Sequence, residues 1–484
     1  MKDTSIKEKN DKNTDFILDM QGVETINKHR NDYIILIEKE TGTWTTLNKS
    51  KSYIIEEILE KGMTFNKFKE LYPHDVELLQ YLFEKGILRI NNQSIKNDKI
   101  TEKRCKISQS KICHIVLRYT KKCNLSCTYC YAHLNVDKKP TMSNDTVLYI
   151  LNKMLNTYQD KTFSLSFHGG EPLLRYKDMV PLVKKIRMLS KNIKLCIQTN
   201  GTLVTREIAQ FLKDEDFEVG ISLDGYNQKT NFHRCQTNGN SSFEKSLIGL
   251  DHLLSVGIIP GLIAVVTGIN QYQLLEIFDF YITKGIKKIN FTPIVPSGKA
   301  SNSDYEIDID NLVSTHIELL KKINKINNQY TETNDYVYES NLTNIMNSLT
   351  SSNVSNLCTL SPCGAGRTTV GFDTDGSIYP CDNFVGYSNF NIGNIYEIED
   401  IKKTMYRGIT TQGLLNRDIN NIPECFVCPW KEICVLRCPS DPYFYSKTFN
   451  KTHSMCAFEK GIIPEIIDLL YKKQIDLKNI IHVK

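Results

Sequence analysis

Apolar and polar residues recur with two different periods along the chain, and the change of period predicts its organisation. Six apolar or alternating runs have the length of β-strands: 113–118, 163–167, 194–198, 218–222, 259–266 and 288–292. Helix-length amphipathic segments such as 144–158 and 243–255 lie between them. Repeated strand–helix alternation is typical of parallel βαβ units. The pattern therefore predicts an α/β fold, a partial (β/α)6 TIM-type barrel over residues 112–303, with chemistry at the carboxyl ends of its strands.

The region before this alternation has shorter elements. Two strand-like runs joined across Gly42 indicate a β-hairpin: 33–38 and 43–47. Three short helical patterns and a further strand-like run follow: 52–59, 65–71, 76–83 and 86–90. A hairpin, three helices and a closing strand predict a winged-helix domain over residues 15–98. The polar, lysine-rich stretch 93–111 has the composition of a linker.

The charge of the chain bears on what this domain binds. Winged helices often bind DNA, but the polar positions of segment 74–84 are mostly acidic and would repel phosphate. The whole chain has 60 Lys and Arg against 55 Asp and Glu, a net charge of +5 that is small for 484 residues. We therefore expect no nucleic-acid partner, and a role in stability alone stays open for this domain.

Three cysteines directly after the first predicted barrel strand form a C-x3-C-x2-C run: Cys123, Cys127 and Cys130. Iron–sulfur cubanes ordinarily take four thiolates. This loop must therefore find a remote fourth Cys or leave one iron free to chelate a small molecule. A zinc knuckle is the plainer alternative, but zinc sites usually pair two C-x2-C halves or add histidines at fixed offsets.

This spacing, with the aromatic Tyr129 before the third Cys, resembles the signature of the radical S-adenosylmethionine (SAM) enzymes. The resemblance implies a 4Fe-4S cluster whose open iron holds the amino and carboxylate groups of SAM. Reductive cleavage of SAM then yields a 5′-deoxyadenosyl radical. The resemblance also implies that Tyr129 lies by the adenine.

The segment Phe-His-Gly-Gly-Glu-Pro at 167–172 follows a predicted strand and opens a helix. Glycines let backbone approach a ligand, and the Glu171 carboxylate could hold an ammonium group. The segment resembles the GGEP motif that contacts the SAM amino group in radical SAM enzymes. On this resemblance, the cofactor-binding residues are Tyr129, Gly169, Gly170, Glu171, Ser222, Arg234 and Val295.

The densest cysteine cluster lies near the carboxyl terminus, after an Asn-, Ser- and Thr-rich bridging segment at 304–353. Its spacing resembles the SPASM domain, here expected over 354–484, which binds two auxiliary 4Fe-4S clusters. The resemblance implies an inner cluster held by Cys358, Cys363, Cys381 and Cys438. It implies an outer cluster held by Cys425, Cys428, Cys434 and Cys456. In some relatives the position of Cys358 is open to a substrate thiolate, and this alternative stays open here.

Nearly the whole chain resembles radical SAM maturases of ribosomally made peptides, in particular the sactipeptide and ranthipeptide synthases. The resemblance implies Cys sulfur-to-carbon thioether crosslinking of a precursor peptide, bound through its leader by the N-terminal domain. We expect the leader to add as a strand to the hairpin edge at 33–38. The expected cofactors are SAM and three 4Fe-4S clusters, and the expected electron donor is a flavodoxin or ferredoxin.

Other activities fit parts of the same pattern. Anaerobic sulfatase-maturating enzymes, which form formylglycine, have an Asp directly after a cluster Cys as general base, and Asp382 follows Cys381 in this way. His168, where those enzymes generally have Gln, and the N-terminal region argue against them. Carbon–carbon or carbon–oxygen crosslinking and epimerisation stay open. A redox-sensing transcription factor is disfavoured, because the SAM-site residues would then have no purpose.

Composition limits the location of the protein. The chain is 40% hydrophobic and 24% charged, which is typical of a folded protein of two to three domains. Fifteen cysteines, no secretory signal and no apolar run long enough for a bilayer predict a cytoplasmic protein with reduced thiols and no membrane partner.

Overall fold

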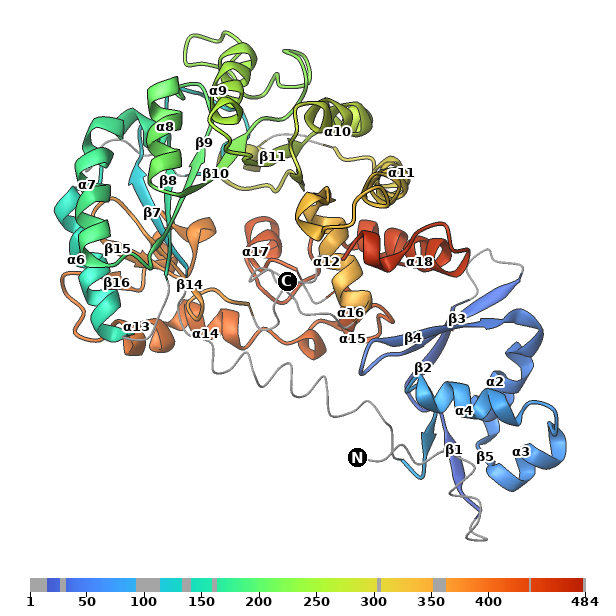
Figure 1. Cartoon of the computed structure of the whole chain (residues 1–484). Coiled ribbons are helices and arrows are strands. Elements are labelled where there is room, and N and C mark those ends of the chain that lie inside the picture. The colour runs from blue at the N-terminus through green and yellow to red at the C-terminus, as the bar shows by residue number, and fades with distance from the viewer. Residues whose placement is uncertain are drawn as a thin grey trace. The chain divides into compact units, whose positions relative to one another are not determined.

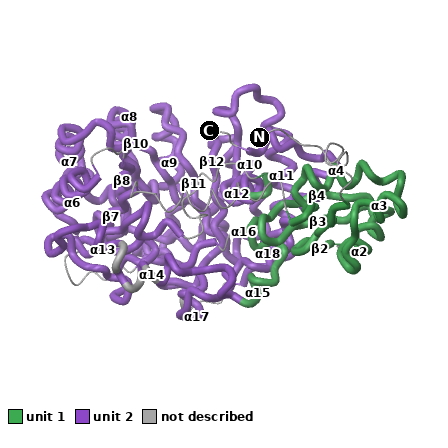
Figure 2. The backbone as a smooth tube through the Cα atoms, turned by 90° about the horizontal axis from the view of Figure 1, so that it is seen from below, with its two compact units in different colours: residues 1–109, 348–351, 423–435 green, residues 110–347, 352–422, 436–484 purple. Residues whose placement is uncertain are grey.

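The computed structural model describes residues 15–26, 32–92, 114–132, 141–158, 163–302, 306–350, 363–434 and 437–481. The chain forms two compact units (Figure 2). Unit 1 comprises residues 1–109, 348–351 and 423–435, and unit 2 comprises residues 110–347, 352–422 and 436–484. The predicted linker at 93–111 lies outside the described residues, and the predicted division into four regions stays a prediction.

Unit 2 contains a ten-stranded sheet of order β13-β12-β11-β10-β9-β8-β7-β14-β15-β16. The six predicted strands are its centre: β7 (His114–Thr120), β8 (Ser164–Gly169), β9 (Lys194–Thr199), β10 (Phe217–Ser222), β11 (Gly261–Val266) and β12 (Lys288–Pro293). They pair in parallel and in chain order, which confirms the predicted α/β fold with a parallel sheet. Their carboxyl ends therefore share one edge of the sheet.

Helices connect these strands and lie along the outer side of the sheet in Figure 1: α6 (Asn144–Thr157), α7 (Tyr176–Leu189), α8 (Arg206–Asp214), α9 (Phe243–Ser255) and α10 (Leu274–Thr283). Hydroxyl side chains fix where two of them begin. Ser143 Oγ accepts from Thr146 N at 3.0 Å, and Thr205 Oγ1 accepts from Ile208 N at 3.2 Å. Such N-caps satisfy backbone donors that the first helical turn leaves free.

The sheet extends beyond the predicted strands at both edges. The short strand β13 (Tyr338–Glu339) pairs in parallel with β12, and β14 (Thr369–Phe372) pairs in parallel with β7. β15 (Ser377–Tyr379) and β16 (Gly393–Asn394) continue it in antiparallel fashion. The segment between Cys363 and Cys381 is therefore part of the same sheet as the predicted barrel.

The remaining helices lie in the predicted bridging and C-terminal regions: α11 (Ile309–Asn327), α12 (Ser340–Leu349), α13 (Ile401–Arg407), α14 (Ile409–Leu415), α15 (Pro423–Phe426), α16 (Lys431–Cys434), α17 (Ser440–Ser446) and α18 (Cys456–Tyr471). Figure 1 shows α11 beside α18. The buried His316 ring of α11 packs edge-on against Phe458 of α18, with 5.0 Å between ring centroids.

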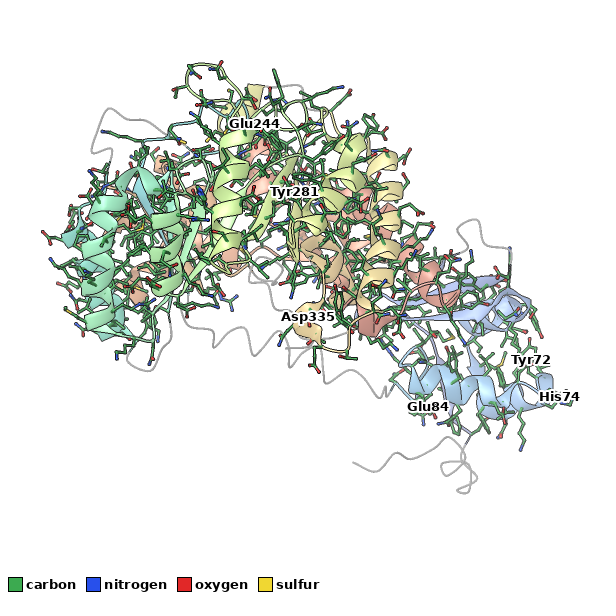
Figure 3. All side chains as sticks on the ribbon, turned by 45° about the horizontal axis from the view of Figure 1, so that its top comes forward. Tyr72, His74, Glu84, Glu244, Tyr281 and Asp335 are labelled. Carbon is green, nitrogen blue, oxygen red and sulfur yellow. The ribbon has the colours of Figure 1, made fainter. Side chains whose placement is uncertain are left out.

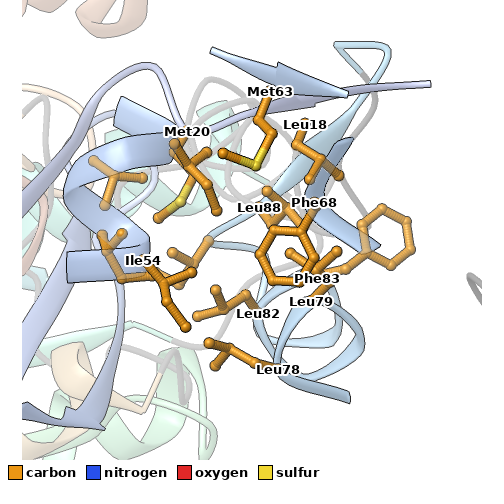
Figure 4. Close-up of a cluster of buried hydrophobic side chains, with 14 of the residues drawn as sticks. Leu18, Met20, Ile54, Met63, Phe68, Leu78, Leu79, Leu82, Phe83 and Leu88 are labelled. Carbon is orange, nitrogen blue, oxygen red and sulfur yellow. The ribbon is translucent and has the colours of Figure 1, made fainter. Parts of the chain in front are cut away.

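Unit 1 contains all the predicted N-terminal elements: β3 (Tyr33–Glu38), β4 (Thr43–Asn48), α2 (Ser52–Lys61), α3 (Phe65–Leu71), α4 (Val76–Glu84) and β6 (Arg89–Ile90). Its core is formed by apolar side chains of the three helices and of the unit's small sheets, among them Leu18, Ile54, Phe68 and Leu82 (Figure 4). The polar side of α4 faces outward, as Glu84 shows in Figure 3.

Three short strands of unit 1 were not predicted: β1 (Ile17–Asp19), β2 (Val23–Ile26) and β5 (Met63–Thr64). β2 pairs with one edge of β3 while β4 pairs with the other. The expectation that a leader adds to the edge at 33–38 is therefore wrong, because both edges of β3 are occupied. The unbroken apolar run Tyr-Ile-Ile-Leu-Ile, rather than an alternating one, was the available sign of a central strand.

Candidate active site

The cysteine loop that follows β7 is fixed by backbone hydrogen bonds to two other segments, one after β10 and one after β12. Ser126 N donates to Cys235 O at 2.8 Å, and Lys299 N donates to Cys130 O at 2.9 Å. The three thiols are half-buried. The neighbouring Cys235 does not complete a four-thiol set, because its thiol donates to Ser126 O at 3.1 Å. The loop thus presents a three-cysteine donor set at the carboxyl edge of the sheet.

Two of these thiols are held in the neutral form by their burial. Burial raises the pKa of Cys123 to about 11 and also raises the pKa of Cys127. Thiolates at these positions therefore need a compensating cation, which the irons of a cluster would supply. Within the described ranges, no three His, Cys, Asp or Glu side chains converge closely enough to hold a single metal ion. A four-iron cluster is wider than one ion and takes its thiolates further apart.

Gly169 and Gly170 let the end of β8 pack directly on this loop. Gly170 N donates to Thr120 O at 2.7 Å, and Glu171 N donates to Lys122 O at 2.8 Å. Gly169 has a φ of +120°, and a Cβ there would lie 2.4 Å from Thr120 O. A Cβ on Gly170 would lie 2.0 Å from Lys122 O. The two glycines are therefore required by the backbone of the cysteine loop itself.

The Glu171 carboxylate is held by protein hydrogen bonds. It is 1% exposed, and Oε1 accepts from Leu173 N at 3.1 Å and Thr199 Oγ1 at 2.8 Å. Oε2 accepts from Asn200 N at 2.8 Å. Burial raises the pKa of Glu171, and these hydrogen bonds oppose that effect. In this arrangement Glu171 joins the ends of β8 and β9, and its predicted contact with the SAM amino group stays a prediction.

Tyr129, Arg234 and an unpredicted residue, Asp224, form a buried polar triad. The Tyr129 hydroxyl donates to Asp224 Oδ2, and Arg234 Nη1 donates to the same hydroxyl at 3.0 Å. Asp224 Oδ1 accepts from Val265 N at 3.1 Å. Arg234 Nε is buried and has no hydrogen-bond partner among the described residues. An unpaired buried guanidinium donor is costly, so this atom fits a site for an anionic group such as a carboxylate.

The other predicted SAM contacts lie at neighbouring strand ends. Ser222 Oγ accepts from Gln198 Nε2 at 2.7 Å, between β10 and β9. Tyr281, labelled in Figure 3, supports the segment after β10 by donating to Gly225 O at 2.8 Å. Val295, after β12, instead packs against an aromatic cluster of the C-terminal region. The glycines and Arg234 thus contact the cysteine loop, whereas Val295 packs against the aromatic cluster of the C-terminal region.

Asp382 has two polar neighbours from the strand ends. Tyr131 Oη donates to Asp382 Oδ2 at 2.5 Å, and His168 Nδ1 lies 3.9 Å from the same oxygen. Burial alone would raise the pKa of Asp382, but His168, the buried Arg118 of β7 and the Tyr131 hydrogen bond outweigh it and lower that pKa. The side chain is therefore an ionised carboxylate. The sequence indicated Asp382 and His168 separately but gave no sign of Tyr131.

Three of the cysteines predicted for the inner auxiliary cluster lie in one region of unit 2. Cys363 and Cys381 pack with Val295 against the aromatic cluster around Phe384. Burial and then the neighbouring Cys438 raise the pKa of Cys363 to about 11. Cys358 lies outside the described residues, and Cys425, Cys428, Cys434 and Cys456 stay a predicted ligand set.

No described helix is both long enough and apolar enough to cross a bilayer.

Sequence comparisons relate the chain to known proteins. Residues 117–281 match the family model of the Radical SAM superfamily. A cysteine-type anaerobic sulfatase-maturating enzyme of Clostridium novyi is 24% identical over 336 residues, which are 66% of this chain and 85% of that protein. An uncharacterized protein of Methanocaldococcus jannaschii is 35% identical over 194 residues, 38% of this chain. The match spans 64% of the length of that relative.

Solved structures show the same fold. The structure titled native anSMEcpe with bound AdoMet has a TM-score of 0.64 at 20% identity, and covers 75% of this chain and 99% of its own. Streptococcus suis SuiB bound to precursor peptide SuiA has a TM-score of 0.56 at 19% identity, and covers 90% of this chain and 100% of its own. Residues 117–281 are therefore similar to the radical SAM family, and the proteins similar to the chain include sulfatase-maturating enzymes and SuiB.

Proposed function

We propose that the protein is a radical SAM maturase that joins Cys sulfur to carbon within a ribosomally made peptide. The observation that supports a peptide thiol as the substrate is the ionised Asp382, which lies beside Tyr131 and His168, and unit 1 together with His168 favours a crosslink as the product. A carboxylate there can take the proton of a substrate thiol close to the position where a radical would form.

Residues of the chain would hold the cofactors as follows. Cys123, Cys127 and Cys130 would hold a 4Fe-4S cluster, and Arg234 Nε would meet the SAM carboxylate. When bound, this pair supplies a 5′-deoxyadenosyl radical, and the auxiliary clusters supply an acceptor for the electron that leaves the substrate. The peptide then loses one hydrogen atom from carbon, one proton from sulfur and one electron as the sulfur–carbon bond forms.

Recognition of a leader through unit 1 is part of the proposal. The SuiB match leaves one tenth of this chain uncovered, which is shorter than residues 1–109, so it must extend into unit 1. SuiB itself was solved with a precursor peptide. Strand addition to a sheet edge would use β2 or β4, the outer strands of the described sheet. A flavodoxin or ferredoxin would supply the electrons.

Formylglycine formation is the second candidate, favoured by the sulfatase-maturating relatives and by Asp382. His168 and unit 1 favour the peptide crosslink instead. Carbon–carbon or carbon–oxygen crosslinking and epimerisation are alternative reactions compatible with the same residues.

Product analysis distinguishes these reactions. The reduced enzyme is incubated with SAM and the peptide of a short Cys-rich reading frame neighbouring its gene. We expect a product lighter by two hydrogen atoms per crosslink, with one alkylatable thiol lost each time. A product of that mass with all thiols alkylatable contains another type of crosslink, whereas an aldehyde formed with loss of sulfur supports formylglycine.

A further inference from the structure

Within unit 1, the tip of the β3–β4 hairpin contacts a segment near the other end of the chain. Lys431 Nζ lies 3.0 Å from Glu40 Oε1, an ion pair between residues 391 positions apart in the sequence. The Lys431 side chain is 3% exposed, while that of Glu40 is 66% exposed. Lys431 also lies 5.5 Å from the centre of the Phe426 ring. A buried ammonium group is costly without a partner, and Glu40 provides the charged one.

The backbones also meet at this point. Gly42, at the hairpin turn, has a φ of +66°, and a Cβ there would lie 2.8 Å from Glu432 Cβ. Two residues further along, in β4, Trp44 Nε1 donates to Leu349 O at 2.9 Å. Segments 348–351 and 423–435 therefore belong to the same compact unit as the N-terminal hairpin.

The contacted segment carries three of the four cysteines predicted for the outer auxiliary cluster. Its turns are tight: Cys428 N donates to Cys425 O at 3.0 Å, and Cys434 N donates to Trp430 O at 2.8 Å. Lys431 lies in the sequence between Cys428 and Cys434. The net charge and burial around an iron–sulfur cluster tune its reduction potential. The Glu40–Lys431 ion pair would therefore affect the reduction potential of any cluster that this segment holds.

We propose that the Glu40–Lys431 pair is a positioning device, through which the N-terminal hairpin holds the Cys425–Cys434 loop and sets the reduction potential of its cluster. The inference rests on the outer cluster of the proposed function. It adds that unit 1 supports this cluster as well as any peptide.

The test compares Glu40→Gln, Lys431→Met and the control Glu24→Gln. Glu24 pairs with Lys39 at 3.7 Å on the same sheet and loses the same charge when replaced. All three changes are made in the full chain with Cys123, Cys127 and Cys130 replaced by Ala, so that only auxiliary clusters remain. Midpoint potentials come from EPR-monitored titration at low ionic strength, where exposed charges are least screened. Cys425→Ser identifies the signal of the outer cluster.

Loss of Glu40 leaves a positive charge that favours the more negative reduced cluster, so its midpoint potential rises. Loss of the positive Lys431 side chain instead lowers the midpoint potential of the cluster. We also expect faster hydrogen exchange of residues 423–435 in Glu40→Gln than in the control. Shifts of the same sign in both variants, or no larger than in Glu24→Gln, would overturn the proposal. Full-chain protein with wild-type cysteines should hold about twelve irons. If it holds about eight, and Cys425→Ser removes none, the outer cluster is absent and the proposal falls with it.

Discussion

At the residue scale, the buried Tyr129–Asp224–Arg234 triad is the most specific support for a SAM site. Tyr129 comes from the cysteine loop, whereas Asp224 and Arg234 both lie in the connection between β10 and α9, so the triad joins these two segments. Asn270 adds a third segment by donating to Asp224 O at 3.0 Å. The position of Arg234 Nε therefore depends on Asp224.

We expect Asp224→Asn to weaken SAM binding because it removes the charge that holds Tyr129 and Arg234. Hydrogen bonds to charged groups contribute about 1.5–3 kcal/mol, which corresponds to a roughly 10- to 100-fold rise in Kd. Calorimetric titration of the reconstituted protein with SAM measures this, and Ser164→Ala, on β8 away from the triad, is the control. Equal SAM affinity in Asp224→Asn and wild type would show that the triad does not support the site.

Asp382 gives a separate prediction, because it lies with Tyr131 and His168, away from the hydrogen bonds that join the described residues of the triad. Asp382→Asn keeps the shape of the side chain but removes the base. We expect peptide modification to fall by at least the roughly 100-fold typical of general-base loss, while 5′-deoxyadenosine still forms. Chromatography of both products from the same reaction gives the ratio. A variant with normal peptide turnover would exclude Asp382 as the base.

At the element scale, much of the architecture could be predicted from periodicity. The six central strands begin and end within a few residues of their predicted bounds, because β-branched and apolar runs alternated with amphipathic helices. β14 was not predicted, since Thr-Val-Gly-Phe is short and is extended mainly by pairing with β7. Asp224 and Tyr131 were missed because their partners are distant in sequence and only the fold brings them together.

Gly170 connects two elements, so its replacement tests their contact. A Cβ at Gly170 would meet the immobile backbone of Lys122, whereas one at Gly261 of β11 would lie 3.6 Å from the flexible Lys288 side chain. Overpacking costs about 1–3 kcal/mol. We expect Gly170→Ala to displace the cysteine loop and lose one cluster, about four irons, while Gly261→Ala keeps it. Iron analysis after anaerobic reconstitution decides between these outcomes; equal iron in both variants would contradict the assigned role of Gly170.

The contact between α11 and α18 gives a pH prediction. Burial lowers the pKa of His316 from 6.5 to about 4. Between these values the unfolded chain binds the proton and the folded chain does not, so stability is lost as pH falls from 6.5 towards 4. The loss approaches about 3 kcal/mol. His316→Phe keeps the ring against Phe458 without the proton site, so its urea midpoint should fall less over this range. If the urea midpoints of the two proteins fall equally with pH, His316 is not the cause of the loss of stability.

At the scale of the whole molecule, the segment that matches the radical SAM family model and the N-terminal elements are not simply successive modules. The compact unit that contains β1 to β6 also contains residues 423–435, which carry Cys425, Cys428 and Cys434. Sequence order could not reveal this, because the contacts join the two ends of the chain. Removing residues 1–98 would therefore take away both the proposed peptide-binding surface and the partner of a cysteine segment.

The formation of 5′-deoxyadenosine by the reduced protein tests the central claim most directly. The anaerobically reconstituted wild type, given SAM and dithionite, should cleave SAM to 5′-deoxyadenosine. The variant with Cys123, Cys127 and Cys130 all replaced by Ala should form none and should hold about four irons fewer. Retention of reductive SAM cleavage in that variant would contradict the assignment of the cysteine loop, and with it the proposed radical chemistry.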